Sequence, residues 1–408
     1  MHQVNAGDTA FILICAALVM LMTPGLAFFY GGLVRRKNFL AIMMQSFVSM
    51  GVVTTVWVFF GYSLAFSGNL GGIIGNLHWF ALDHVGQSPG PWAPTIPAIT
   101  HFVYQEMFAI ITPALITGAF ADRVKFKSYL WFLVLWSLLV YVPFTHWIWG
   151  GGFLAQHGVL DFAGGMVVHV SAGFAALASV FVVGKRKFLP GERTLPHNVA
   201  FVALGTGLLW FGWFGFNGGS ALAANGIAAQ AWINTDVAGS IAMCTWLGIA
   251  WWRDGKPSLV GALTGAVAGL ACITPCAGYI PIWASFIVGL AAGSVCYFAV
   301  VFKRRMDWDD ALDVWAAHGV GGFMGAVLLG VFAFKSINAA GADGLVAGNA
   351  AFFGWQVLAV VITATYSFVV TFLILKFLNL FGSVRVPDSV ELKGLDASEL
   401  GEEAYNLD

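Results

Sequence analysis

The sequence predicts an all-α polytopic membrane protein with eleven transmembrane helices, the N-terminus outside the membrane and the C-terminus inside it. Three observations predict this class. Of the 408 residues, 59% are hydrophobic and only 10% are charged, whereas roughly a quarter of an ordinary soluble domain is charged. Clusters of basic residues separate long apolar runs, and an Asp-x7-His motif occurs twice, on helices expected to run in opposite directions.

Eleven apolar runs are long enough to cross a bilayer, for which a helix needs about 20 residues. They cover approximately residues 8–34, 39–66, 98–121, 128–149, 162–184, 197–219, 228–252, 258–276, 279–302, 310–334 and 350–381. The first run is too long for the apolar core of a signal peptide and no basic region precedes it, so we expect it to be retained as a helix.

Basic residues occur in every second connection between the runs. The five basic clusters lie within residues 35–37, 123–127, 185–193, 253–256 and 303–305. The loops without Lys or Arg are 67–97, 150–160, 220–230 and 276–281. Because basic loops stay in the cytoplasm, this alternation sets the orientation and an odd number of spans. We expect residues 1–381 to form the transmembrane domain and residues 382–408, with seven of the twenty acidic residues, to form a cytosolic tail.

The composition excludes several kinds of partner and site. The chain has 19 Lys and Arg against 20 Asp and Glu, so it lacks the clustered excess of positive charge that nucleic-acid binding needs. Its five cysteines are an odd number inside or at the edge of apolar runs and show no disulfide framework or zinc-ligand spacing. We therefore expect no disulfide, no metal and no cofactor.

Two features recur on helices that run in opposite directions. The Asp-x7-His motif occupies residues 161–169 in the fifth run and 310–318 in the tenth. The aromatic-glycine segment 28–32 ends the first run, and its counterpart 214–219 ends the sixth. Spans 1–5 and 6–10 are therefore expected to be inverted repeats, which place a site near the membrane midplane. If each Asp lies at the interface, eight residues of helix, about 12 Å, bring each His to mid-bilayer.

Histidines inside a membrane are costly to bury and indicate a function by default. A structural contact between two helices is the first alternative. Haem ligation is the second, but the sequence offers no further His pair and no nearby Cys or carboxylate to accompany these two residues. An intramembrane enzyme is not expected either, because the spans contain no Ser/His/Asp arrangement and no carboxylate dyad.

Four long motifs resemble one known family. They are Asp161-Phe-Ala-Gly-Gly-Met-Val-Val-His169, Phe211-Gly-Trp-Phe-Gly-Phe216-Asn-Gly-Gly-Ser220, Asp310-Ala-Leu-Asp-Val-Trp-Ala-Ala-His318-Gly and the tail Gly394-Leu-Asp396…Gly401-Glu-Glu-Ala-Tyr405. In this order they resemble the ammonium transporter (Amt) branch of the Amt/Mep/Rh family, from the first span to the tail. The resemblance implies a multi-pass homotrimer in the inner (plasma) membrane, in which each subunit encloses its own narrow, mostly apolar pore for ammonium or ammonia.

The resemblance also implies roles for individual residues. The outer ammonium-binding site would consist of Tyr104, Phe108, Trp149 and Ser220, the gate below it of Phe108 and Phe216, and the pore centre of His169 and His318, with Asp161 and Gln105 in support. Tyr104 stands where many members carry Phe. Either histidine could relay a proton, because imidazole titrates near neutrality.

Physical chemistry agrees with these roles. Ammonium donates four hydrogen bonds, so a selective site should offer aromatic faces and an acceptor oxygen. A desolvated cation–π contact contributes about 2 kcal/mol, whereas removing all water from an ion in an apolar medium costs on the order of tens of kcal/mol. Desolvation lowers the pKa of a cation. We therefore expect ammonium to lose its proton and to cross the pore as ammonia, with or without separate transfer of the proton.

The tail resembles the cytosolic regulatory segment of the family through Gly394, Asp396, Gly401, Glu402 and Tyr405. Leu400 stands where members usually carry His, so any polar contact of that His is missing here. The resemblance implies a tail that docks on the neighbouring subunit and a nitrogen-regulatory PII protein as partner at the cytosolic face. The alternative functions are an ammonium sensor with little conduction and a channel for carbon dioxide.

Overall fold

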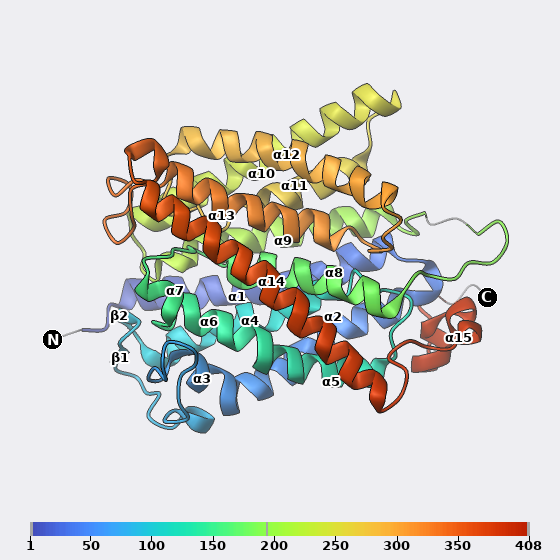
Figure 1. Cartoon of the computed structure of the whole chain (residues 1–408), viewed down its shortest axis with the longest axis horizontal. Helices are drawn as coiled ribbons and strands as arrows, with labels where there is room; N and C mark the ends of the chain where they lie inside the picture. The colour runs from blue at the N-terminus through green and yellow to red at the C-terminus, as the bar shows by residue number, and fades with distance from the viewer. Residues whose placement is uncertain (1–2, 193–194, 406–408) are drawn as a thin grey trace.

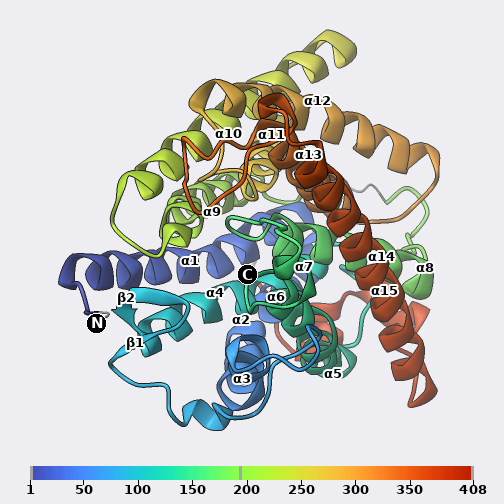
Figure 2. The same ribbon diagram turned by 60° about the vertical axis from the view of Figure 1, so that its left-hand side comes forward.

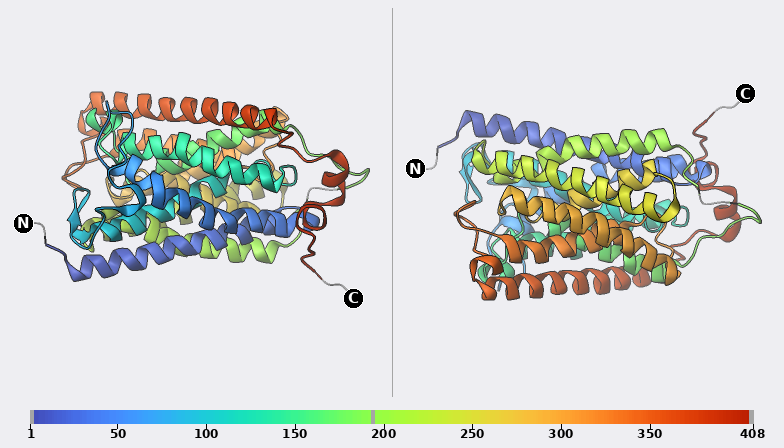
Figure 3. Two further views of the ribbon diagram at one scale, coloured as in Figure 1. Left: turned by 90° about the horizontal axis from the view of Figure 1, so that it is seen from below. Right: turned by 90° about the horizontal axis from the view of Figure 1, so that it is seen from above.

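The computed structural model describes residues 3–192 and 195–405 as a bundle of long helices aligned along one axis (Figure 1). The start of α1 and a small antiparallel hairpin of β1 (Pro89–Gly90) and β2 (Ala93–Pro97) lie at one end, the hairpin end. Helix α15 (Asp388–Lys393) lies at the other end, the tail end. Views from below and from above that of Figure 1 show that the long helices run between these two ends (Figure 3).

Eleven helical runs make up the described part of the bundle. The uninterrupted runs are α1 (Ala6–Leu33), α4 (Ala98–Ile116), α10 (Gly226–Asp254), α11 (Leu259–Ile273), α12 (Ile282–Arg305) and α14 (Ala350–Leu380). The composite runs are η1 (Arg36–Asn38), α2 (Phe39–Val56), η2 (Trp57–Gly61) and α3 (Tyr62–Phe66); α5 (Phe126–Trp136), η4 (Ser137–Tyr141) and α6 (Val142–Ile148); η5 (Gly165–Val170) and α8 (Ser171–Val183); α9 (Val199–Gly218) and η6 (Gly219–Ala221); and η7 (Trp315–Val320) and α13 (Gly321–Phe332). The short elements outside them are η3 (Phe80–Leu82), α7 (Phe153–Gln156), η8 (Leu345–Ala347) and η9 (Asp396–Leu400).

The helical class of the chain is confirmed. Within residues 3–192 and 195–405, nine of the runs are long and apolar enough to cross a membrane. The other two are α10, with 29 residues, and the shorter apolar α11, with 15. All eleven follow the predicted spans in order. Which end faces the cytoplasm stays a prediction.

Side-chain caps explain where several runs begin. Polar side chains at these positions accept hydrogen bonds from backbone N–H groups of the first turn, which otherwise have no partner. The capping residues are Asn5, Asn198, Asn225, Ser258 and Asn349. All five are short polar residues placed directly before an apolar run, so the helix starts are encoded locally.

The helices of the two histidine motifs begin later than expected. The fifth and tenth spans were expected to begin at residues 162 and 310, but η5 begins at Gly165 and η7 at Trp315. Asp161 and Asp310 precede the helices, with their carboxylates bonded to the first N–H groups, and both are buried in the protein. The rise of about 12 Å from Asp to His therefore does not apply. In both halves a capping Asp precedes a π-helical turn that carries the His, which supports the predicted repeat.

Helices α1 and α9, the first of each repeat, pack with their backbones in contact. A Cβ atom added to Gly205 would lie 2.3 Å from the backbone nitrogen of Phe29, and one added to Gly212 would lie 2.6 Å from the carbonyl oxygen of Leu18. Only glycine fits at such a crossing, which is typical of helices packed inside membranes. Figure 2 shows α1 beside α9. The two repeats are thus joined along their length.

Charged side chains connect the loops at the tail end. Asp309 pairs with Arg123 at 3.1 Å and with Arg186 at 2.7 Å, and Arg35 pairs with Asp122 at 2.9 Å. Burial by itself would raise the pKa of Asp309, but the hydrogen bonds from Arg186 and the charge of Arg123 lower this pKa to about 2. Residues from several of the predicted basic clusters therefore meet at one end of the bundle.

We expect Asp309→Asn to destabilise the protein by about 3 kcal/mol, because it leaves the fully buried Arg123 without a charged partner. The exposed pair of Lys185 and Asp307 provides the control, and Asp307→Asn should change stability by less than about 1 kcal/mol. Because the pKa of Asp309 lies below its ordinary 3.8, its contribution should persist above that pH and disappear as the pH falls toward 2. Melting temperatures of both variants against pH check this, and equal melting temperatures would contradict it.

Candidate functional site

A cavity of about 450 Å³ opens at the hairpin end. Its lining includes His101, Gln105, Phe108, Trp149, Asp161 and Ser220. The sequence therefore identified five of these six residues. We call this space the Trp149 cavity.

Asp161 holds the wall of this cavity in place. Its carboxylate accepts hydrogen bonds from four consecutive backbone N–H groups, those of residues 164–167, at 2.7 to 3.1 Å. Its carbonyl oxygen accepts a hydrogen bond from the indole nitrogen of Trp149 at 2.7 Å. Both carboxylate oxygens are therefore occupied, so Asp161 positions the indole and the start of η5 and has little capacity left for a ligand.

Tyr104 lies behind the cavity rather than in its lining. Its side chain is completely buried, and its hydroxyl group lies 2.8 Å from the carbonyl oxygen of Phe216 and 3.3 Å from the Ser220 Oγ atom. Ser220 in turn donates to the carbonyl of Phe216 at 2.9 Å. The hydroxyl that distinguishes Tyr104 from the Phe expected at this position thus fixes the end of α9 and the orientation of Ser220.

Two aromatic rings close the bottom of the cavity. The ring centroids of Phe108 and Phe216 lie 4.2 Å apart, and both residues are about 1% exposed. The indole of Trp149 stands nearly perpendicular to Phe108, at 5.9 Å and 88°. In this conformation the Phe pair separates the Trp149 cavity from the interior of the bundle.

His169 and His318 meet directly beneath this pair. Their Nδ1 atoms lie 3.2 Å apart, and the ring planes are inclined by 20°. In a neutral pair, one Nδ1 donates and the other accepts, so one Nε2 carries a proton while the other has a free lone pair. The Nε2 atom of His169 is buried without a hydrogen-bond partner in the described chain. The pair can therefore offer a donor and an acceptor to a small molecule.

Glycines bring the two histidines together. A Cβ atom on Gly173, one turn after His169, would lie 2.1 Å from the Cα atom of Gly319, which follows His318. A Cβ on Gly322 would lie 2.8 Å from the Cβ of His169. The helices η5–α8 and η7–α13 can approach this closely only because these positions have no side chain.

The space beside the histidines is narrow and apolar. It has a volume of about 10 Å³, close to the smallest that holds one water molecule. Besides Phe216 and the histidines, its lining includes Ile111, Leu115, Leu209, Trp213 and Val267. Sequence reasoning missed Trp213, although it precedes Phe216 by three residues and therefore lies on the same face of α9. Its indole nitrogen donates to Thr274, which keeps the ring face toward His169.

The sequence matches the Ammonium Transporter Family over residues 10–405. The chain belongs to this family. The ammonium transporter of Bacillus subtilis is 48% identical over 401 residues, which cover 98% of each chain. The crystal structure of Saccharomyces cerevisiae Mep2 is similar with a TM-score of 0.89 at 35% identity and covers 95% of this chain and 91% of that one. A structure described as a Sensor Amt Protein gives a TM-score of 0.89 at 28% identity, over 96% of this chain and 98% of that one.

Membership in the ammonium transporter family agrees with the prediction that the chain is a transporter and not an enzyme. The structure gathers Phe108, Trp149, Ser220, Gln105 and Asp161 around one cavity and places the gate and the histidine pair below it. Their roles in binding and conduction stay predictions.

Trp149→Leu should raise the ammonium concentration for half-maximal uptake by roughly 5- to 30-fold, because the variant loses the aromatic face but keeps an apolar side chain. Trp252→Leu, at the 84% exposed Trp252 near the end of α10, is the matched control. Uptake by proteoliposomes over a range of ammonium concentrations measures the effect. The same half-saturation in both variants and the unmodified protein would argue against an ammonium site at Trp149.

Proposed function

We propose that this member of the ammonium transporter family binds ammonium in the Trp149 cavity, removes its proton and conducts ammonia past the histidine pair. The observation that carries the proposal is the vertical order of the groups: an aromatic cavity, a closed Phe pair, and then two hydrogen-bonded histidines beside an apolar space. A hydrated cation has no room beside the histidines. A neutral molecule the size of water does.

The cavity supplies groups suited to ammonium. The faces of Trp149 and Phe108 attract a cation, and the Ser220 oxygen accepts an N–H bond. The same contacts cannot replace a full hydration shell, because one cation–π contact contributes about 2 kcal/mol against tens for complete dehydration. Loss of the proton removes most of this cost before the molecule reaches the apolar space.

The histidine pair is the proposed centre of the pore. Ammonia donates three hydrogen bonds and accepts one, so a lone pair on one Nε2 and a proton on the other complement it. When the Nδ1 proton moves to the other ring, that ring can release its own Nε2 proton and the first ring can take one up at Nε2, and these three proton movements together exchange the two roles. The pair could thus also return a proton to the molecule or carry it separately.

A sensor with little conduction is the alternative function. The structural similarity to the Sensor Amt Protein equals that to Mep2, with a TM-score of 0.89 for both. The sequence identity is lower, 28% for that structure against 48% for the Bacillus subtilis transporter. Transport is therefore the better-supported function.

We further propose a homotrimer in the plasma (inner) membrane with the tail end in the cytoplasm. On α10, Trp232 and Ile233 are 44% and 40% exposed, and the neighbouring Asp236 is also exposed. A carboxylate facing lipid near the bilayer centre costs at least about 2.5 kcal/mol. A second copy that covers this face of α10 would remove that cost.

The grouping of the basic clusters at the tail end supports a cytoplasmic location for the tail end.

The tail is docked on its own chain. The carboxylate of Asp396 accepts bonds from the backbone N–H groups of Leu40 and Ala41 at 3.0 and 2.8 Å, which caps α2. Asn38 accepts the N–H of Leu395 at 2.8 Å. Leu400 packs against the apolar group formed by Ala41, Val386 and Leu395. Leu400 thus makes a hydrophobic contact where the family was expected to provide a polar one.

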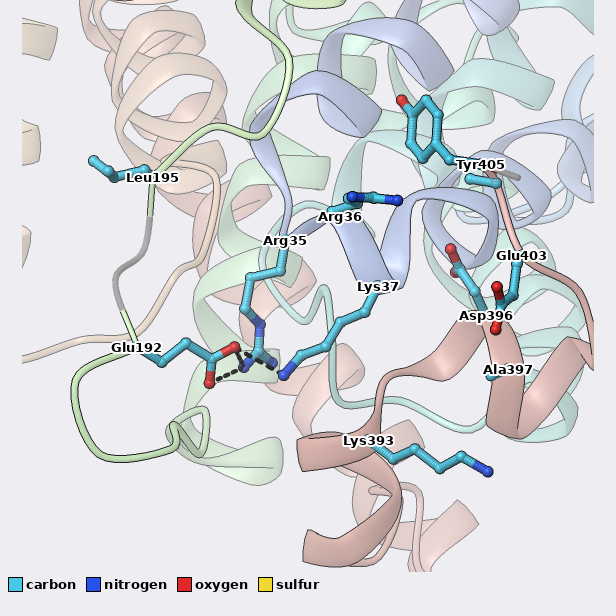
Figure 4. A pocket seen from close by; sticks show the side chains of 11 residues that line it. Arg35, Arg36, Lys37, Glu192, Leu195, Lys393, Asp396, Ala397, Glu403 and Tyr405 are labelled. Atoms are coloured by element: carbon cyan, nitrogen blue, oxygen red, sulfur yellow. Dashed lines mark hydrogen bonds and ion pairs between the residues drawn. The ribbon is translucent and has the colours of Figure 1, made fainter. Parts of the chain in front are cut away.

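The remaining tail residues have separate roles. Gly394 has φ +112° and a Cβ there would lie 2.7 Å from Lys37, so glycine is required. Gly401 ends η9 with φ +71°, and the N–H of Glu402 then donates to the carbonyl of Asp396. The guanidinium of Arg36 lies over the ring of Tyr405, 5.1 Å from its centroid, and both residues line a cavity between the tail and the α1–α2 connection (Figure 4). These contacts support a regulatory docked tail over the described residues 382–405.

Replacing His169 or His318 by Ala should abolish ammonium uptake or its selectivity over other cations, because each change opens the narrow space and removes the proton-sharing partner. Glu at one of the positions restores a titratable group and should retain part of the conduction. Uptake and selectivity in proteoliposomes, with the oligomer verified by size, provide the measurement. Ala variants with an unchanged rate, selectivity and pH profile would show that the pair is structural.

Deletion of residues 394–408 should lower transport more than in proportion when truncated and full-length chains are mixed in one oligomer. Loss of the Asp396 cap frees the start of α2, and a subunit contact would transmit the change. Substitution of the exposed Glu403 by Gln should have little effect. Full activity that is independent of the neighbouring subunit would refute the tail proposal.

We also propose a PII protein as partner at this face, and absence of PII binding with every nucleotide tested would refute that partner alone.

A further inference from the structure

We infer that His101 and Gln105 form a second ammonium-binding position in the Trp149 cavity, with the Nε2 atom of His101 as the hydrogen-bond acceptor. The inference rests on the proposed function, because it assigns another contact to the same substrate. It adds a residue for which the sequence suggested no role.

His101 is placed on the cavity side of α4. Residues 101, 105 and 108 follow each other at helical spacing and line the same cavity. His101 is 3% exposed, and its ring packs edge-on against Phe66 at 5.0 Å. The Phe66 ring therefore restricts the orientation of the His101 side chain, which also lines the cavity.

Only one of the two ring nitrogens of His101 has a partner within residues 3–192 and 195–405. Its Nδ1 atom lies 3.0 Å from the hydroxyl oxygen of the buried Tyr62. No hydrogen bond of the Nε2 atom occurs in this part of the chain. The Nε2 atom is not completely buried, so a ligand in the cavity can reach it as an acceptor.

Gln105 provides a second acceptor one helical turn away. It is 8% exposed, and its Oε1 atom is buried without a hydrogen-bond partner in the described residues. Side chains four residues apart on a helix have Cβ atoms about 6 Å apart. One ammonium ion spans acceptors about 5 Å apart when each N–H bond is near 2.9 Å. The two side chains thus lie on one face of α4 and line the same cavity, so we place a single ammonium ion between them.

Tyr62 sets the proton position on His101. If Nδ1 donates to the Tyr62 hydroxyl oxygen, the Nε2 of the neutral ring is an acceptor and suits the N–H groups of ammonium. If the Tyr62 hydroxyl instead donates to Nδ1, then Nε2 carries the proton and repels a donor. Ammonium favours the first arrangement. Tyr62 is therefore a positioning residue that acts through His101.

The chemistry of the site distinguishes ammonium from methylammonium. Ammonium has four N–H donors, so it can bond His101 and Gln105 and keep two donors for water or an aromatic face. Methylammonium has three donors and a bulky apolar group in place of the fourth. Removal of the His101 acceptor should therefore cost ammonium more than it costs methylammonium.

The test compares variants in proteoliposomes by their uptake of ammonium and of methylammonium. His101→Leu should raise the ammonium concentration for half-maximal uptake by about 10-fold, as expected for one lost hydrogen bond to a charged group. It should also reduce the preference for ammonium over methylammonium. His101→Gln places an acceptor near the original Nε2 and should stay within about 3-fold of the unmodified protein. Tyr62→Phe should fall between these two variants.

Tyr366→Phe is the matched control for Tyr62→Phe, because the Tyr366 hydroxyl donates to the carbonyl of Leu139, away from the cavity. Unchanged half-saturation and preference in His101→Leu would overturn the inference. If His101→Leu fails to assemble, Tyr62→Phe decides, and its agreement with Tyr366→Phe would overturn the inference as well. If the unmodified protein takes up no more ammonium than empty vesicles do, the proposed function itself fails.

Discussion

The capping of η5 by Asp161 is the interaction on which the site depends. A carboxylate buried in a membrane protein is stable only with its hydrogen bonds satisfied, and here four backbone N–H groups satisfy it. The same residue binds the indole of Trp149 through its carbonyl oxygen. One buried acid therefore fixes both the aromatic wall of the cavity and the helix that carries His169. Without this cap, neither the Trp149 indole above the Phe pair nor the helix that carries His169 below it would be held in place.

The second repeat uses the same device at the opposite end, with a different outcome. Asp310 caps η7 through the N–H of Trp315 at 2.8 Å, and Lys303 bonds its carbonyl oxygen. The other carboxylate oxygen of Asp310 is buried without a partner among the described residues. Asp310 thus belongs to the charged group at the tail end, whereas Asp161 lines the Trp149 cavity. The inverted repeats have the same local backbone arrangement, a capping Asp before a π-helical turn, but the side chains around the two Asp residues differ.

Much of the fold could be predicted from the sequence, because span length, basic loops and the repeated motifs each follow from the cost of polar groups in lipid. The helix starts at Gly165 and Trp315 could not, because an Asp that caps a helix resembles one that begins it. The contact of His169 with His318 depends on distant glycines whose partners a sequence does not reveal. Trp213 and His101 were missed because each is an ordinary buried aromatic residue by composition, and only its neighbours show that it lines a cavity.

We propose that ammonium crosses the apolar space only after giving up its proton. Potassium provides the comparison, because it is close to ammonium in size and charge and has no proton to lose. The measurement is the uptake of ammonium and of a radioactive potassium analogue by the same proteoliposomes and by empty vesicles. We expect protein-dependent ammonium uptake, no protein-dependent uptake of the potassium analogue, and little inhibition by excess potassium. Uptake of the potassium analogue at a rate comparable to that of ammonium would contradict the account.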